Sequence, residues 1–365
     1  MSAAPRNLKA LTTLRYFAAI WVVLFHYWDS LTNAAMPALV AKGYLGVELF
    51  FVLSGFILCH VYLQSAGEGG FRYGGFLWTR LARIYPLHLA TLLGLGLVAL
   101  AARGGGMDMG DKVLVWSSLP AQLLLAQAWG LAPNGGWNHP SWSISAEWMA
   151  YLAFPVFAWV AWRLRDRPRV AVTMALIFTA GLYFVFGRVT GQPLTRATIA
   201  WGALRIVPCF AYGCALYLAW RAQPAKGSRW APLAALGFLA AIVASVAISA
   251  PDALTVGLFG GLIFWLARFS ERPSLMTSPI GVYLGEVSFA VYMVCIPWQL
   301  VFAHVASRVL HLPAGPLPWP VWALMLASVT PVAMLAHHLV ERPARLAMRG
   351  WRLGPSMAET PQPVV

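Results

Sequence analysis

Apolar segments long enough to cross a lipid bilayer recur along the whole chain, and they limit its fold more than any other feature. Of the 365 residues, 60% are hydrophobic and 10% are charged, whereas a soluble domain has about 25% charged residues. A helix of roughly 17–25 apolar residues spans the hydrocarbon layer. The pattern therefore predicts an all-α integral membrane protein. The apolar segments are 11–28, 44–63, 76–102, 113–131, 144–165, 170–187, 200–220, 230–250, 253–270, 281–304 and 319–340.

The net charge of +14 follows from an excess of arginine. In a soluble protein such a charge would suggest nucleic-acid binding. Here the cations lie mostly between the apolar segments, where the positive-inside rule places them, so we expect no nucleic-acid partner. The cysteines all lie within apolar segments and form no disulfide or zinc pattern, and no metal site is expected. They are Cys59, Cys209, Cys214 and Cys295.

The distribution of cations also predicts the topology. If the N-terminus is cytosolic and segment 113–131 does not span, most Lys and Arg residues fall on the cytosolic side. If that segment spans, every later loop changes sides and most cations fall outside. We therefore expect about ten crossings in one bundle with both termini cytosolic, and 113–131 as a re-entrant or interfacial segment. Residues 1–350 form one membrane domain, followed by a short disordered tail, 351–365.

Ionisable residues within membrane helices are costly to insert and are candidates for function. Arg15 and His26 lie about three turns apart on nearly the same face of the first helix, roughly 16 Å along its axis. Arg80 and Arg83 share a face of the third segment, and their planar guanidinium groups suit phosphate. The alternatives are that Arg15 is an anchor at the membrane interface, that His26 is merely interfacial and that the Arg pair is ordinary cytosolic positive charge.

Glu147 begins the fourth crossing from the outer side, and we expect it at the depth of His26. A carboxylate at that depth would orient the imidazole and stabilise its protonated form. The alternative is that a neighbouring serine caps the helix with Glu147 in its first turn. Glu48, at the outer start of the second helix, is a further candidate for the same cavity.

The sequence resembles the integral membrane acyltransferase 3 family over essentially its whole length. The motifs occur in the family's order: Arg15 with His26, the run 43–56 (GYLGVELFFVLSGF), Arg80 with Arg83, Trp142-Ser143 with Glu147, and Glu341-Arg342-Pro343. The resemblance implies O-acylation with acetyl-CoA as the donor. It implies that His26 and its partners, of which we take Glu147 to be one, are needed for the transfer, and that Arg15, Arg80 and Arg83 serve the donor or the local structure. We expect Glu48, Trp142 and Ser143 to contact the acceptor. Cys295 stands where many relatives have His, so we expect a packing role there.

These features together predict a multi-pass enzyme of the bacterial inner membrane. An acyl-CoA would bind its phosphates at the cytosolic arginines and extend its thioester toward His26, which would act as general base or as an acyl-accepting nucleophile. The acceptor would be a lipid-linked or polymeric saccharide, an exopolysaccharide precursor, and polysaccharide biosynthesis or export proteins are possible partners. The alternative is a transporter or flippase for a glycan intermediate, since intramembrane charges also suit a substrate pathway.

Overall fold

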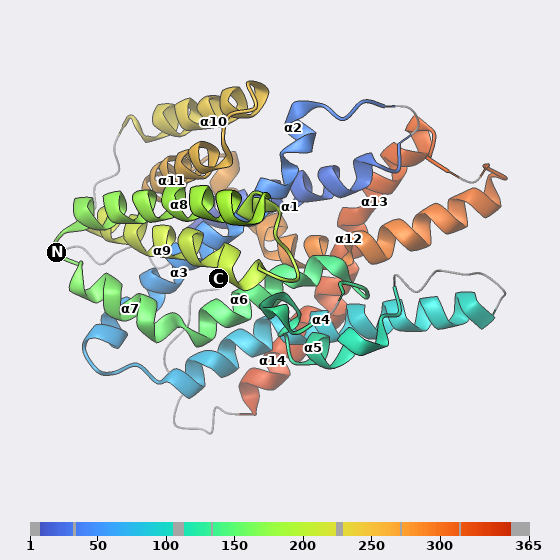
Figure 1. The fold of residues 1–365 in the computed structure, drawn as a ribbon, viewed down its shortest axis with the longest axis horizontal. Helices are drawn as coiled ribbons and strands as arrows, with labels where there is room; N and C mark the ends of the chain where they lie inside the picture. Colours follow the sequence, from blue (N-terminus) through green and yellow to red (C-terminus); the bar gives the residue numbers. More distant parts are fainter. Residues whose placement is uncertain are drawn as a thin grey trace.

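The computed structural model describes residues 8–31, 34–104, 113–132, 134–223, 229–270, 272–313 and 315–351. Throughout these ranges the chain is helical and has no β-strand. Figure 1 shows the helices packed lengthwise against one another in a single bundle. The predicted tail lies outside the described residues, apart from Trp351.

Eight helices in the described ranges are long and apolar enough to cross a membrane, some of them together with a short flanking helix. A ninth crossing is formed if the bent pair α6 (Trp142–Leu152) and α7 (Phe154–Arg163) counts as one span. The shorter apolar helix α10 (Ala231–Ala247) has 17 residues. The eight are α1 (Lys9–Trp28), α3 (Gly46–Gly67), α4 (Tyr73–Gly104), α8 (Pro168–Thr190), α9 (Gly202–Arg221), α11 (Asp252–Phe269), α12 (Pro279–Val309) and α13 (Trp319–Ala336).

These helices coincide with the ten segments predicted to cross, so the all-α membrane fold is confirmed. The side of the membrane on which each terminus lies stays a prediction. The bend of 57° between α6 and α7 has a local cause. Pro155 lies in the first turn of α7, where it lacks the N–H that would continue the ladder of α6.

The segment predicted to be re-entrant or interfacial does not form a membrane-length helix. Its described part contains only short pieces: η2 (Trp116–Ser118), α5 (Leu119–Leu123), η3 (Gln127–Leu131) and then η4 (His139–Ser141). Its polar groups bond to the bundle, as lipid cannot satisfy them. The Gln122 carbonyl lies 2.9 Å from His88 Nε2, and the Ala128 N–H donates to Ser145 Oγ at 3.0 Å. Protein covers part of this segment, including Gln122 and Gln127, whereas Trp116, Leu124 and Leu131 are exposed.

Glycines bring α3 and α9 into backbone contact at the centre of the bundle. A Cβ atom on Gly55 would lie 2.1 Å from the Phe210 carbonyl oxygen, and one on Gly213 would lie 2.0 Å from the Val52 carbonyl oxygen. Small residues allow such an approach between membrane helices. Gly55 and Gly213 therefore serve helix packing.

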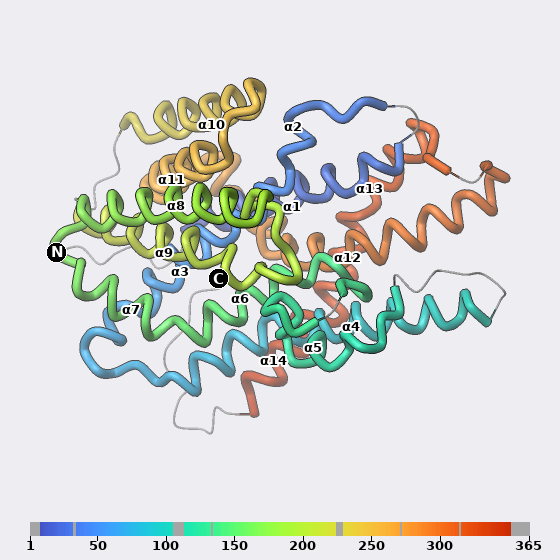
Figure 2. Tube along the Cα trace, in the orientation of Figure 1, coloured from blue at the N-terminus to red at the C-terminus, as the bar shows by residue number. Residues whose placement is uncertain are grey.

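The first and last described helices each pack against a long helix of the bundle. Helix α1 packs along α12, where the Tyr27 hydroxyl donates to the Cys295 carbonyl at 2.8 Å. After α13 the chain forms the π-helical turn η7 (His337–Glu341) and the last helix, α14 (Arg342–Gly350). Figure 2 follows α14 back to the first turns of α4, where Trp78 Nε1 donates to the Met348 carbonyl at 2.7 Å.

Candidate active site

One cavity lies between α1, α3, α4, α6 and α12. Aliphatic and aromatic side chains form most of its wall, which is typical of binding sites for organic ligands. A few polar side chains interrupt that wall and give it chemical character. They are Thr12, Arg15, Ser54, Arg80, Arg83, Ser143, Glu147, Tyr151 and Tyr292.

The three arginines predicted to serve the donor all line this cavity. Arg15 comes from α1, while Arg80 and Arg83 come from adjacent turns of α4 and are only 7% and 8% exposed. Their charges are close enough to interact with one another. The Arg80 guanidinium lies 5.8 Å from the centre of the Tyr62 ring, and its Nε is buried without a hydrogen-bond partner in the described part of the chain.

Glu147 faces this cationic wall. The Ser54 hydroxyl donates to Glu147 Oε1 at 2.6 Å, and the carboxylate interacts with Tyr151 and with the Arg15 guanidinium. Among the described residues, it does not form the pair with His26 that the sequence suggested. Glu147 lies in the second turn of α6, and the chain has entered the bundle before that helix begins. Glu147 therefore reaches the arginines rather than the end of α1.

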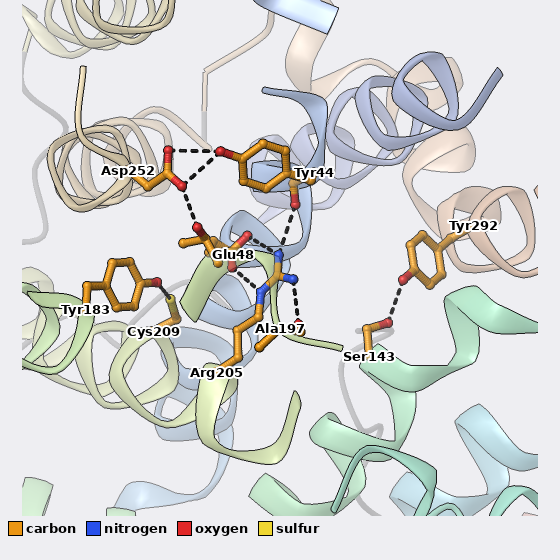
Figure 3. Close-up of polar contacts among 10 residues, drawn as sticks. Tyr44, Glu48, Ser143, Tyr183, Ala197, Arg205, Cys209, Asp252 and Tyr292 are labelled. Atoms are coloured by element: carbon orange, nitrogen blue, oxygen red, sulfur yellow. Dashed lines mark hydrogen bonds and ion pairs between the residues drawn. The ribbon is translucent and has the colours of Figure 1, made fainter. Parts of the chain in front are cut away.

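A hydrogen-bonded group closes the opposite end of the cavity. The Ser143 hydroxyl donates to Tyr292 Oη at 2.8 Å, and the Tyr292 hydroxyl donates to the Pro140 carbonyl at 2.8 Å. Figure 3 shows Ser143 and Tyr292 reaching toward each other from two elements. Ser143 thus lines the cavity, in keeping with a place on the substrate path, and Tyr292 is a neighbour that the sequence did not reveal.

His26 lies in the last turn of α1 and is not among the residues that line this cavity. Its side chain is half-buried, with the ring edge-on to Phe25 at 5.3 Å between centroids, and its carbonyl accepts from Gln299 Nε2 at 3.2 Å. His139, which precedes Pro140, is close enough to interact with His26. His26 therefore lies outside the cavity that the arginines line.

Glu48 is not in the cavity, contrary to the expectation from sequence. It forms a buried ion pair with Arg205: Arg205 Nε donates to Oε1 at 2.5 Å and Nη2 to Oε2 at 2.8 Å (Figure 3). The two side chains are 0% and 2% exposed. The same guanidinium lies 4.6 Å from the centre of the Trp142 ring, and Trp142 does not line the cavity either. Both residues belong to a structural contact between α3, α6 and α9.

A second polar cluster, around Asp252, stands next to this ion pair and was not predicted. Asp252 begins α11 and accepts from the Tyr44 hydroxyl at 2.9 and 3.1 Å (Figure 3). It also accepts from Thr195 and from Lys42. It joins the ends of three segments that are distant in the sequence. The only sequence signal for the Asp252 cluster was a charged residue at the start of an apolar segment. Uncharged residues of the cavity, such as Ser54, had no comparable signal in the sequence.

Cys295 is fully buried and does not line the cavity. Its thiol donates to the Tyr292 carbonyl at 3.0 Å, one turn earlier on α12. This environment is that of a packed core residue, as the sequence suggested.

The family profile described as "Acyltransferase domain" matches residues 8–338. All five helices that form the cavity begin within that range, and it covers nearly the whole chain. The chain belongs to the acyltransferase 3 family. It is a multi-pass membrane enzyme that transfers acyl groups, and this membership decides against the transporter alternative.

The names of similar proteins support the same class of enzyme. The chain is 30% identical to "Acyltransferase MdmB" of Streptomyces mycarofaciens, over 79% of this chain and 78% of that protein. It is 25% identical to "Nodulation protein 10" of Rhizobium leguminosarum bv. viciae, over 91% of each. It is 23% identical to "Putative peptidoglycan O-acetyltransferase YrhL" of Bacillus subtilis (strain 168), over 93% of this chain but 55% of that protein. No solved structure matches the chain.

Proposed function

We propose that this enzyme moves an acetyl group from cytosolic acetyl-CoA to a sugar hydroxyl of a lipid-linked or polymeric saccharide in the bacterial inner membrane. The saccharide is a precursor of an exopolysaccharide or another surface glycan. The observation that carries the proposal is the convergence of Arg15, Arg80 and Arg83 on one cavity. The name of the Bacillus subtilis relative, which specifies O-acetyl transfer to a glycan, supports the choice of group and acceptor.

The cationic wall suits the phosphates of the donor. Arg80 and Arg83 lie near the start of α4, at the cytosolic end of the predicted topology, and guanidinium groups bind phosphate through paired hydrogen bonds. Glu147 holds Arg15 toward the cavity and limits repulsion among the cations. The apolar wall above them accommodates an extended pantetheine arm and its thioester.

His26 is proposed as the general base. It removes the proton of the sugar hydroxyl, whose oxygen then attacks the thioester carbonyl. The carbon–sulfur bond breaks, and the thiolate of CoA takes the proton back from the imidazolium, so that acetyl sugar and CoA are the products. In the present conformation His26 does not line the cavity. The bundle must therefore rearrange to bring the thioester within reach of His26.

The test is transfer of label by the purified protein. Protein in lipid nanodiscs is incubated with acetyl-CoA carrying a labelled acetyl group and with a lipid-linked saccharide from the host's surface glycan. We expect labelled saccharide from which mild base releases acetate. Absence of label in every saccharide supplied, with acetyl-CoA bound by the protein, would contradict acetyl transfer to a glycan.

A further inference from the structure

The C-terminal helix α14 places two more arginines beside the cationic wall. Helix α14 packs along the first turns of α4. Arg345 lies close enough to Arg83 for their charges to interact, and Arg349 interacts in the same way with Arg80 and with Tyr62, the ring below Arg80. Neither Arg345 nor Arg349 was singled out by the sequence analysis.

These pairs form two levels of positive charge. Arg349 with Arg80 forms the level nearer the free end of α14, and Arg345 with Arg83 forms the next one. Residues four apart on a helix are about 6 Å apart along its axis. Arg15 lies beyond the second level, toward Glu147. A diphosphate and a phosphate on one ribose could occupy the two levels together.

Among the described residues, the cluster has more positive charge than the neighbouring carboxylates balance. Five arginines meet two carboxylates, Glu147 and Glu341, and Glu341 Oε2 also lies 2.9 Å from His337 Nδ1. In the described part of the chain, the buried Nε atoms of Arg80, Arg345 and Arg349 have no hydrogen-bond partner. Buried donors are rarely left unpaired in native structures, so the arrangement points to an anionic ligand with more than one phosphate group.

We propose that Arg349, with Arg80, binds the 3′-phosphate of the CoA donor, while Arg345 joins Arg83 at the diphosphate. This assignment rests on the proposed function and deepens it. The orientation of CoA determines which of its phosphate groups occupies which level. The diphosphate is connected to the pantetheine arm, which extends into the cavity toward Ser143, so it takes the inner level. The 3′-phosphate carries no further chain and takes the outer one.

Equilibrium binding of CoA and of dephospho-CoA, which lacks only the 3′-phosphate, tests the assignment without requiring transfer. The protein is held in phosphatidylcholine nanodiscs. We expect the wild type to bind CoA about tenfold to a hundredfold more tightly than dephospho-CoA, the range for charge-assisted hydrogen bonds. Arg349→Gln should reduce that ratio to within about threefold of one. Arg349→Lys, which keeps the charge but not the planar fork, should retain part of it.

Two further variants separate the levels. Arg345→Gln should weaken binding of both ligands by a similar factor and leave the ratio unchanged. Arg169→Gln removes an exposed cation at the start of α8, outside the cavity, and should change neither affinity. The ratio is measured within each variant, so partial loss of folded protein does not alter it.

The same measurement with phosphatidylglycerol in the nanodiscs distinguishes a lipid headgroup from the nucleotide. A wild-type ratio near one, with Arg349→Gln changing only the retention of phosphatidylglycerol, would assign the cluster to lipid and overturn the proposal. An unchanged ratio in Arg349→Gln would overturn it as well. Binding of CoA with the expected ratios but without acetyl transfer would instead contradict the proposed function alone.

Discussion

Individual side chains determine the chemistry of the cavity, and the local environments of its arginines differ. Arg15 faces the carboxylate of Glu147, whereas Arg80 lies over Tyr62 with a buried and unpaired Nε in the described structure. A guanidinium that the protein itself balances is suited to a fixed structural position. One that lacks a partner is suited to an incoming anion. Arg80 is therefore the cavity arginine whose environment points most clearly to a ligand.

The role of His26 is tested by removing its imidazole. We expect His26→Ala to lower kcat about 10²–10⁴-fold, the usual contribution of a general base. The KM for acetyl-CoA should stay nearly unchanged, because His26 lies apart from the arginines. Steady-state transfer by purified protein measures both constants. His304→Ala, at an exposed histidine of α12, is the matched control. A rate close to that of the wild type in His26→Ala would remove His26 from the mechanism.

At the scale of elements, the contact between α3 and α9 holds both the cavity wall and the Glu48–Arg205 pair in place. The helices touch at Gly213, where the nearest backbone oxygen leaves no room for a side chain. We expect Gly213→Val to destabilise the protein by about 1–3 kcal/mol or to prevent folding, because overpacking forces backbones apart. Thermal unfolding in detergent measures this. Gly237→Ala on α10, where a Cβ meets no atom within 4 Å, should unfold within a few degrees of the wild type.

The ion pair of Glu48 with Arg205 is a second test of how these elements are joined. Removing one partner leaves an uncompensated buried charge, which costs about 3–5 kcal/mol. We expect Glu48→Leu and Arg205→Leu each to lower the unfolding temperature strongly, and the double variant to recover much of the loss. Losses that simply add in the double variant would show that the two residues are not coupled.

The sequence predicts the helices well because membrane spans need long apolar segments and loops collect positive charge. It also predicts that Arg15, Arg80 and Arg83 meet, since their helices enter from one side with the arginines at similar depth. The pairing of Glu147 with His26 failed for a physical reason. Depth was inferred from where the apolar segment starts, but the chain is already buried at Pro140 and Ser141, before α6 begins. The rotation of α3 about its axis turns Glu48 toward Arg205. That rotation cannot be predicted from hydropathy.

At the scale of the whole molecule, transfer from cytosolic acetyl-CoA requires the arginine end of the cavity to face the cytosol. The described cysteines are all buried, so one introduced cysteine can report on each side. We expect Gln192→Cys, in the exposed turn after α8, to react with a membrane-impermeant maleimide on intact cells. Asp166→Cys, in the exposed turn before α8, should react only after the membrane is opened. The reverse pattern would invert the topology and place the arginines outside.

The most direct measurement is an experimental structure of the protein with CoA bound in lipid nanodiscs. We expect the phosphates of CoA to lie within hydrogen-bond distance of the guanidinium groups of Arg80 and Arg83. The pantetheine arm should extend between α3, α4 and α6 toward Ser143. CoA bound elsewhere, or a lipid chain filling this cavity while CoA occupies another site, would contradict these predictions.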